Sequence, residues 1–246
     1  MSHHAQDTSA IPPPALEGRS IQAGYGSEPV VRDVDIIVHQ GEVVVLLGPN
    51  GAGKTTTLRA LAGAIGLQAG AVLRDGLAVR TALDKRARAG MALVTEERSV
   101  FPSLTVEQNL RVGRCNVDHA LELFPELAGR LRVPAGLISG GEQQMLTLGR
   151  ALARAPSLLL ADELSLGLAP KIVERLLAAV RSAADSGIAV LLVEQHVRRA
   201  LEIADRGYVL ARGRVEAEGT ASQLRSQVAD IERSYLALSD APFENQ

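Results

Sequence analysis

Four short runs of consecutive apolar residues stand out along this chain. They are VVVLL at 43–47, MALV at 91–94, LLLA at 158–161 and AVLLV at 189–193. A strand with one face in solvent alternates apolar and polar residues, whereas a strand covered on both faces is apolar throughout. The four runs therefore predict the buried strands of an α/β sheet that is covered on both faces.

Helical patterns alternate with these runs. Pro170 suits a first helical turn, and the apolar residues after it recur with a 3.6-residue period up to Val180. Residues 105–155 are mostly helical in pattern, which predicts a helical subdomain at about 98–155. Near the end of the chain, Arg212 and Gly213 indicate a hairpin, and a helix is expected from about 222 to 238.

Shorter strand-like pieces occur before and after the first apolar run. SIQA at 20–23 and VDIIV at 34–38 flank the turn-rich YGSEP, and AVLRDG at 71–76 has the same character. These pieces predict an antiparallel β layer next to the central sheet. The predicted fold class is thus an α/β core with an antiparallel β layer and a helical subdomain.

The ends of the chain differ in composition from the rest. Residues 1–15 are polar and proline-rich, which predicts a disordered leader, and residues 240–246 are expected to form a tail outside the domain at 16–239. The adjacent His3 and His4 are more often inert tail residues than metal ligands. The leader lacks the apolar segment of a secretory signal.

Composition narrows the possible classes of protein. Of the 246 residues, 46% are hydrophobic and 22% are charged, which excludes global disorder. The net charge of −2 offers no electrostatic footprint for nucleic acid. Cys115 is the single cysteine, so an intrachain disulfide is impossible and a reducing cytosol is expected. No run approaches the roughly 18 apolar residues of a membrane span.

A phosphate-binding motif follows the first apolar run, where residues 48–55 read GPNGAGKT. Its glycines let the backbone fold around a phosphate chain, Lys54 supplies a charge for the outer phosphates, and the Thr55 hydroxyl is placed to bind Mg²⁺. A strand before the loop and a helix after it complete an anion site. ATP or GTP is predicted to bind to Gly48, Pro49, Asn50, Gly51, Ala52, Gly53, Lys54, Thr55 and Thr56.

Acidic residues close the third apolar run, where residues 158–163 read LLLADE. A carboxylate at the tip of a buried strand beside a phosphate loop can hold Mg²⁺ through its waters, and this role is predicted for Asp162. Glu163 is then placed to polarise a water for attack on the γ-phosphate. An acidic strand end before an exposed loop would account for LLLADE alone, but the upstream phosphate loop favours catalysis.

Two further motifs carry candidate chemistry. His196 closes VEQH after the fourth apolar run, at the sheet edge where nucleotides bind, which suits a hydrogen bond to the γ-phosphate. Ser139, Gly140 and Gly141 open SGGEQ at a predicted helix start, which makes a second anion-ready site. Because one nucleotide does not need two γ-phosphate sites, a head-to-tail pair of subunits is predicted, each covering the other's ATP.

GPNGAGKTT, ISGGEQQ, LLLADE and VEQH, in this order and spacing, resemble the motifs of the ATP-binding subunits of ABC transporters over essentially residues 16–238. The resemblance identifies the core as that of a P-loop NTPase. It also implies that Tyr25 stacks on adenine, that Glu163 is the catalytic base, and that the segment containing Ser139 and Glu142 closes on the partner's nucleotide.

Residues 94–110 and SLGLAP at 165–170 are similar to the branched-chain amino acid importer ATPases. There, a position that is usually glutamine often carries a glutamate, here Glu96, which is expected beside ATP and Mg²⁺. The similarity implies a peripheral subunit on the cytoplasmic face of the cell membrane. Its partners would be a second ABC ATPase, identical or related, two transmembrane permease subunits that FPSLTV would face, and indirectly a solute-binding protein.

Several positions depart from the family pattern without removing a reacting group. Thr95 and Glu97 stand where the subfamily has Pro and Gly, Leu164 replaces a usual Pro, and Ala169 replaces a usual Asp. Importers of urea or other small solutes and lipid exporters are the neighbouring alternatives. A soluble ABC ATPase would usually bring coiled-coil insertions or a second cassette, and a GTPase would need an NKxD-like guanine reader. The chain has none of these.

Overall fold

The computed structural model describes residues 12–239. The predicted tail and most of the predicted leader therefore lie outside the described residues. Ala15, the last residue of that predicted leader, is fully buried in the same apolar cluster as Leu16 and Ile21. The packed chain thus begins earlier than the sequence pattern indicated, because a small apolar residue next to the first strand completes its packing.

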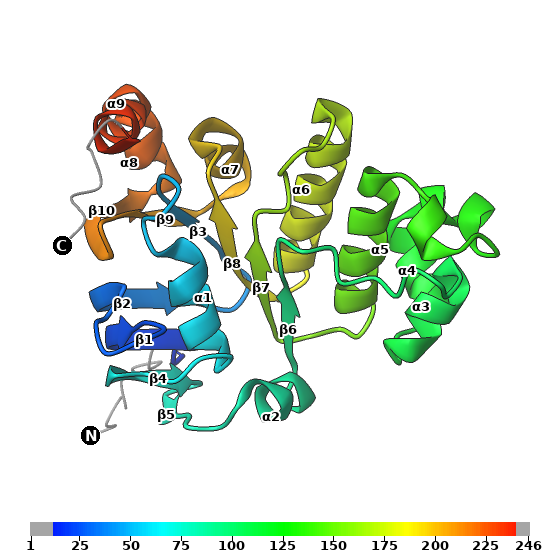
Figure 1. The fold of residues 1–246 in the computed structure, drawn as a ribbon, viewed down its shortest axis with the longest axis horizontal. Coiled ribbons are helices and arrows are strands. Elements are labelled where there is room, and N and C mark those ends of the chain that lie inside the picture. Colours follow the sequence, from blue (N-terminus) through cyan, green and yellow to red (C-terminus); the bar gives the residue numbers. More distant parts are fainter. Residues whose placement is uncertain (1–11, 240–246) are drawn as a thin grey trace, which may run out of the picture.

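A six-stranded sheet forms the centre of the molecule, in the order β10-β9-β3-β8-β7-β6 (Figure 1). β6, β7, β8, β3 and β9 run parallel, and β10 is antiparallel to β9. β3, β7 and β8 are buried at every residue, as their apolar runs predict. The strands are β3 (Val43–Leu47), β6 (Met91–Val94), β7 (Leu158–Asp162), β8 (Ala189–Glu194), β9 (Arg206–Ala211) and β10 (Arg214–Thr220).

The predicted antiparallel layer is a second sheet in the order β2-β1-β4-β5. It packs on the central sheet through an apolar cluster that contains Ile36 from one sheet and Leu46 from the other. The buried Tyr208 ties the layers together, because its hydroxyl accepts a hydrogen bond from the Ile37 amide at 3.1 Å. The strands are β1 (Leu16–Ala23), β2 (Val31–Val38), β4 (Ala69–Arg74) and β5 (Leu77–Ala78).

Helices complete the fold, and α3, α4 and α5 lie together at one end of the molecule (Figure 1). This cluster falls within the predicted helical subdomain. The helix expected at 222–238 is instead two helices that meet at Gln227, whose backbone leaves the helical conformation. The helices are α1 (Lys54–Ala62), α2 (Leu83–Arg88), α3 (Val106–Val112), α4 (Val117–Leu123), α5 (Gly140–Leu152), α6 (Pro170–Asp185), α7 (Val197–Ile203), α8 (Ala221–Ser226) and α9 (Val228–Ser239), with 3₁₀ turns η1 (Pro125–Arg130) and η2 (Ala135–Leu137).

The predicted hairpin between β9 and β10 holds the loop that follows β3. The Gly213 amide donates to the Ala52 carbonyl at 2.9 Å, and the Gly213 carbonyl accepts from the Arg32 amide at 2.8 Å. Gly213 has φ of 75°, and a Cβ there would clash with the Val30 carbonyl oxygen. A glycine is therefore required where the hairpin, β2 and the loop meet.

Helix length and hydropathy also bear on membrane insertion. The described part of the chain contains no helix long and apolar enough to cross a bilayer.

Candidate functional site

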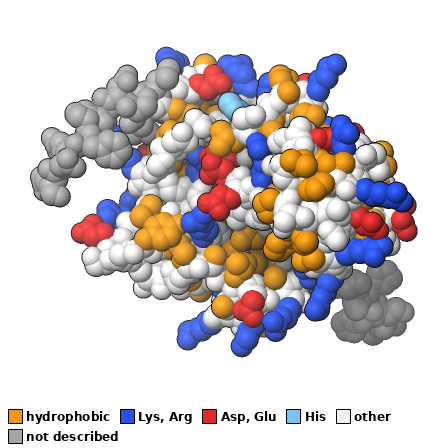
Figure 2. Space-filling model, turned by 45° about the vertical axis from the view of Figure 1, so that its right-hand side comes forward, with side chains coloured by type: hydrophobic (Ala, Val, Ile, Leu, Met, Phe, Trp, Pro, Cys, Tyr) orange, Lys and Arg blue, Asp and Glu red, His pale blue; other side chains and the backbone are white. Residues whose placement is uncertain are grey.

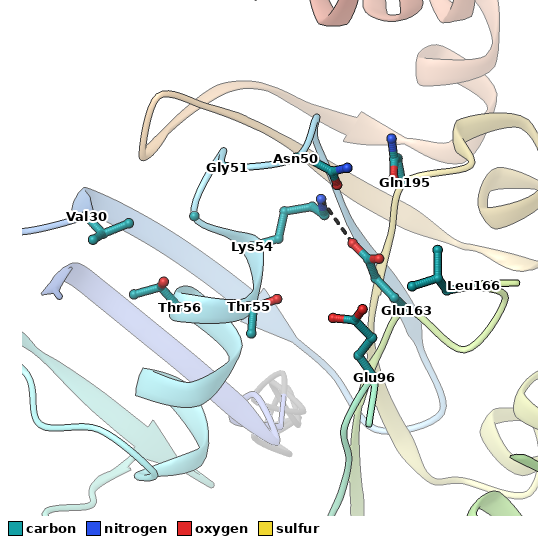
Figure 3. A pocket seen from close by; sticks show the side chains of 11 residues that line it. Val30, Asn50, Gly51, Lys54, Thr55, Thr56, Glu96, Glu163, Leu166 and Gln195 are labelled. Carbon is teal, nitrogen blue, oxygen red and sulfur yellow. Dashed lines mark ion pairs between the residues drawn. The ribbon is translucent and has the colours of Figure 1, made fainter. Parts of the chain in front are cut away.

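A cavity of about 400 Å³ opens where the β3–α1 loop faces the carboxyl ends of β7 and β8 (Figure 3). This is the edge of a parallel sheet at which ligands commonly bind. The cavity brings together most of the phosphate loop with Glu96 and Glu163, as predicted. Its lining residues are Val30, Asn50, Gly51, Gly53, Lys54, Thr55, Thr56, Glu96, Glu163, Leu166 and Gln195.

The phosphate loop ends in an uncapped helix N-terminus. Gly53 is the N-cap of α1 and has φ of 99°, and within residues 12–239 no capping side chain accepts a hydrogen bond from the first amides of this helix. The first amide groups of a helix have no intrahelical acceptor and carry its partial positive charge. Gly48, Pro49 and Ala52 do not line the cavity, and the Ala52 amide donates to the Pro49 carbonyl at 3.2 Å within the loop. The arrangement is thus suited to an anion of phosphate type.

Lys54 and Glu163 face each other across this cavity. The Lys54 ammonium lies 3.3 Å from a Glu163 carboxylate oxygen and 3.1 Å from the Pro49 carbonyl oxygen (Figure 3). Their side chains are only 4% and 12% exposed, so the pair is largely shielded from water. Glu163 has φ of 45°, a left-handed conformation unusual for a residue other than glycine. Such local strain concentrates at functional sites.

Asp162 lies buried next to this pair and is only 2% exposed. Burial raises the pKa of its carboxyl group to about 6, while a hydrogen bond with the Thr55 side chain opposes that rise and the charges of Glu163 and Glu96 add to it. Its Oδ1 atom has no hydrogen-bond partner among the described residues. A buried carboxylate oxygen without a partner is costly unless something else binds it.

The donor atoms here fit Mg²⁺. Thr55, Asp162 and Glu96 offer only oxygen atoms, which this cation prefers, and the free Asp162 Oδ1 would gain a partner. Among residues 12–239, no three His, Cys, Asp or Glu side chains converge into a metal site of their own. Mg²⁺ at phosphoryl-transfer sites commonly uses one or two carboxylates together with water and substrate phosphate, so a third carboxylate is not required.

Two predicted residues lie outside the cavity lining. Tyr25 is 61% exposed in the β1–β2 loop, and its hydroxyl accepts a 3.3 Å hydrogen bond from Arg59 of α1. His196 is exposed at the start of α7, while the preceding Gln195 lines the cavity. Neighbouring side chains on an extended segment point in different directions, so only one of these two can face the phosphate loop.

The SGGEQ motif begins α5, as predicted, and lies apart from the cavity lining. Ser139 accepts a hydrogen bond from the Glu142 amide at 3.3 Å, and the Glu142 carboxylate accepts one from the Ser139 amide at 2.8 Å. Arg130 also binds Glu142 at 2.8 Å and lowers the pKa of that carboxyl group. Glu142 is therefore occupied as a helix cap. Ser139 is exposed and Gly140 and Gly141 are partly exposed at the surface.

Sequence reasoning did not single out three of the lining residues. Val30 precedes β2, Leu166 follows Glu163 in the chain, and Gln195 follows β8. Of these, only Gln195 carries a signal in the sequence, because it is a polar residue just after a buried strand. Val30 and Leu166 reach the cavity through the tertiary fold, since apolar residues in loops have no pattern that predicts such a position.

Comparison with known proteins gives a consistent picture. The family model described as "ABC transporter" matches residues 31–165. The "High-affinity branched-chain amino acid transport ATP-binding protein BraG" of Pseudomonas aeruginosa is 42% identical over 210 residues, which is 81% of this chain and 90% of that protein. The "Probable branched-chain amino acid transport ATP-binding protein LivF" of Archaeoglobus fulgidus is 37% identical over 216 residues, 83% and 91% of the two chains.

Solved structures agree at the level of the fold. One described as "Structure of ATP binding subunit of ABC transporter" superposes with a TM-score of 0.77 at 28% identity and covers 92% of this chain and 100% of that chain. A second, "Dimeric Structure of MJ0796, a Bacterial ABC Transporter Cassette", gives a TM-score of 0.75 at 23% identity over 84% and 98% of the two chains. At that lower identity the likeness concerns the fold alone.

Replacing Asp162 by asparagine is expected to stabilise the ligand-free protein above pH 6. The folded-state pKa of about 6 lies above the ordinary 3.8, so the charged carboxylate opposes folding above pH 6. This corresponds to at most about 3 kcal/mol in the free energy of unfolding. As the pH falls from 6 towards 3.8, the folded wild-type protein takes up the proton and the advantage of the variant shrinks. Denaturant unfolding in EDTA at pH 8 and pH 5 measures this difference.

Asp75→Asn is the matched control for this prediction. Asp75 is exposed in the β4–β5 turn with φ of 50°, a conformation that asparagine tolerates equally well. Its stability should stay close to that of the wild type at both pH values. A lower stability of Asp162→Asn than of the wild type at pH 8 would contradict the account of a carboxylate held without sufficient partners.

Proposed function

The chain belongs to the ATP-binding family of ABC transporters, and we propose that it hydrolyses ATP to drive an importer of branched-chain or related amino acids. The main support for the catalytic part is the cavity in which the phosphate loop, Lys54 and Glu163 face one another. The similarity to BraG and LivF supports the choice of solute.

In this proposal the cavity binds the phosphate chain of ATP. The amide groups at the start of α1 and the Lys54 ammonium hold the outer phosphates. Glu163 leaves its contact with Lys54 and accepts a hydrogen bond from a water molecule. This bond orients the water towards the γ-phosphate. Mg²⁺, held by Thr55, Asp162 and Glu96, would neutralise charge on the phosphate oxygens. Tyr25 and His196 would reach adenine and the γ-phosphate only after local movement.

A second ATPase subunit is proposed to complete the site. Two solved cassettes with this fold are described as dimeric. In this chain the surface segment Ser139–Gly141 lies at the N-terminus of α5, where the Gly140 and Gly141 amides have no acceptor within the helix, and it does not line its own cavity. A head-to-tail pair would place that segment of each subunit over the nucleotide of the other. The pair consists of two copies of this chain or of this chain and a related ATPase.

The permease subunits are proposed to dock beside residues 96–104. Asn109 of α3 is fully buried and holds this segment, because its side chain accepts from the Phe101 amide at 2.8 Å and donates to the Leu104 carbonyl at 3.1 Å. Phe101 itself is 48% exposed. A hollow of about 520 Å³ between α2, β6 and α5 lies nearby and contains Arg88, Arg150 and Arg154. This arrangement suits a partner that is partly apolar and partly acidic.

The surface view supports a docking face of this kind. Figure 2 shows hydrophobic side chains gathered in a hollow, with lysine and arginine side chains along its lower edge. Docking to permeases there would hold the protein at the cytoplasmic face of the membrane. A solute-binding protein would then act on the permeases rather than on this chain, so the amino acid is selected by other subunits.

Glu163→Gln should reduce ATP turnover to background while ATP binding is retained. Glutamine keeps the size of the side chain but cannot accept a proton from water, whereas the phosphate loop is unchanged. Lys54→Ala should instead weaken ATP binding itself, since it removes the charge that faces the phosphates. Phosphate release and equilibrium binding of a fluorescent ATP analogue by the full chain separate the two effects.

Glu216→Gln serves as the control, because Glu216 is exposed on β10 away from the cavity. It should keep both wild-type turnover and wild-type binding. Wild-type turnover by Glu163→Gln would exclude the proposed catalytic base.

The solute can be tested in cells in which the chain is the sole source of this ATPase. With Glu163→Gln in place of the wild type, uptake of labelled leucine should fall to the level of a deletion strain, while urea uptake is unchanged. The reason is that hydrolysis at Glu163 reopens the ATPase pair and so resets the permeases for the next transport cycle. Normal leucine uptake together with lost urea uptake would instead favour the alternative, an importer of urea or another small solute.

A further inference from the structure

Glu194, the last residue of β8, is a buried carboxylate to which the catalytic proposal gives no role. Its side chain is only 2% exposed, although it lies next to Gln195, which lines the cavity. Both carboxylate oxygens are hydrogen-bonded to one residue. The Ser165 amide donates to one oxygen at 3.2 Å, and the Ser165 hydroxyl donates to the other at 2.7 Å.

These bonds matter because Ser165 lies close to Glu163 in the chain. Ser165 follows Glu163 by two residues, at the point where the chain leaves β7. The Glu163 amide is held by the Val193 carbonyl at 2.9 Å, one residue before Glu194. β8 therefore hydrogen-bonds to this segment at two points. The Val193 carbonyl binds the Glu163 amide, and the Glu194 side chain binds Ser165. Between these two points Glu163 adopts its left-handed backbone conformation.

Beyond Ser165 the same segment reaches the surface. Leu166 is 47% exposed and lines the cavity, and Gly167 has φ of 67° in the following turn. Figure 3 shows Leu166 on one side of Glu163 and Gln195 above it. Ser165 is thus the boundary between a strained residue that must hold its position and a turn that is open to solvent.

A buried carboxylate at this place carries a cost. Burial raises the pKa of Glu194 to about 7. The two hydrogen bonds from Ser165 and one from the Gln195 amide oppose this rise, and the nearby charge of Glu163 adds to it. A buried charge held only by neutral donors contributes little net stability compared with an apolar residue. The interaction is therefore better explained by the geometry that it imposes than by stabilisation of the fold.

We propose that Glu194 is a positioning residue for ATP hydrolysis: by holding both the amide and the hydroxyl of Ser165, it fixes the backbone at Glu163 and the direction of its carboxylate. The inference rests on the proposed function, because it assigns Glu194 to the same reaction. It also links the exposed turn at Leu166 to Glu163, so that a displacement of the turn by a second subunit moves the catalytic carboxylate.

The test is the kinetics of the full chain carrying Glu194→Gln, Ser165→Ala or Ser165→Thr. Glutamine places an NH₂ group where one Ser165 donor needs an acceptor, and alanine removes the hydroxyl donor. We expect each of these two variants to lower kcat at least about tenfold while KM for ATP stays within about twofold, as for loss of an interaction needed only in the transition state. Ser165→Thr keeps the hydroxyl and should restore most of the turnover.

The double variant Glu194→Gln/Ser165→Ala should be no slower than the slower single variant, because both changes break the same interaction. Tyr208→Phe is the control for a purely structural effect. It removes a buried hydroxyl that bonds the Ile37 amide on the opposite side of the sheet, and it should lower the melting temperature without changing kcat.

The outcomes separate the inference from the proposed function. If Glu163→Gln is inactive but Glu194→Gln and Ser165→Ala keep kcat within about twofold of the wild type, the inference is wrong and the proposed function stands. If the wild-type chain itself does not hydrolyse ATP, both fail. If Glu194→Gln does not fold, the comparison of Ser165→Ala with Ser165→Thr decides, because equal kcat values for these two variants would overturn the inference.

Discussion

The interaction on which the site depends is the close approach of Lys54 and Glu163 at one edge of the central sheet. A largely buried ion pair needs a rigid surrounding, since each charge is costly without the other. The fully buried strands β3, β7 and β8 provide that rigidity, and their carboxyl ends deliver the phosphate loop, Asp162 with Glu163, and Glu194 with Gln195 to the same place. The second sheet and the β9–β10 hairpin then hold the loop from behind through Gly213.

Several features of this edge favour ligand binding over stability. Asp162 keeps a buried oxygen without a partner among the described residues, Glu163 has a strained backbone, and the start of α1 lacks a capping side chain within residues 12–239. A bound cation would give the Asp162 oxygen a partner, and a phosphate chain would accept from the free amides of α1. The strained backbone at Glu163 is a feature typical of functional sites. By contrast, the strands β3, β7 and β8 behind this edge are apolar almost throughout and are buried along their whole length. At this edge of the sheet, features that suit ligand binding are therefore kept although they lower the stability of the ligand-free fold.

The hydrophobic pattern predicted β3, β6, β7 and β8 to within a residue, because a strand inside a covered sheet leaves an uninterrupted apolar run. The phosphate loop and the acidic end of β7 were predicted from motifs instead, because phosphate and Mg²⁺ binding each allow only a few residue types. The pattern did not reveal the break at Gln227 or the burial of Ala15, since both depend on tertiary packing. The sequence pattern also gave no role to Glu194, whose contacts depend on tertiary packing too. Its bonds to Ser165 join residues 29 positions apart, and no periodicity records such a contact.

The central claim is that this chain carries half of each nucleotide site and that a second subunit supplies the other half. Mixing a Lys54→Ala chain with a Ser139→Arg chain tests it directly, because a head-to-tail pair of the two contains one site with an intact phosphate loop and an intact SGG segment. Each variant alone should be inactive, and the mixture should regain ATP turnover that rises with the fraction of mixed pairs. Inactivity of the mixture at every ratio, or turnover by Ser139→Arg alone, would contradict a site shared between two copies of this chain.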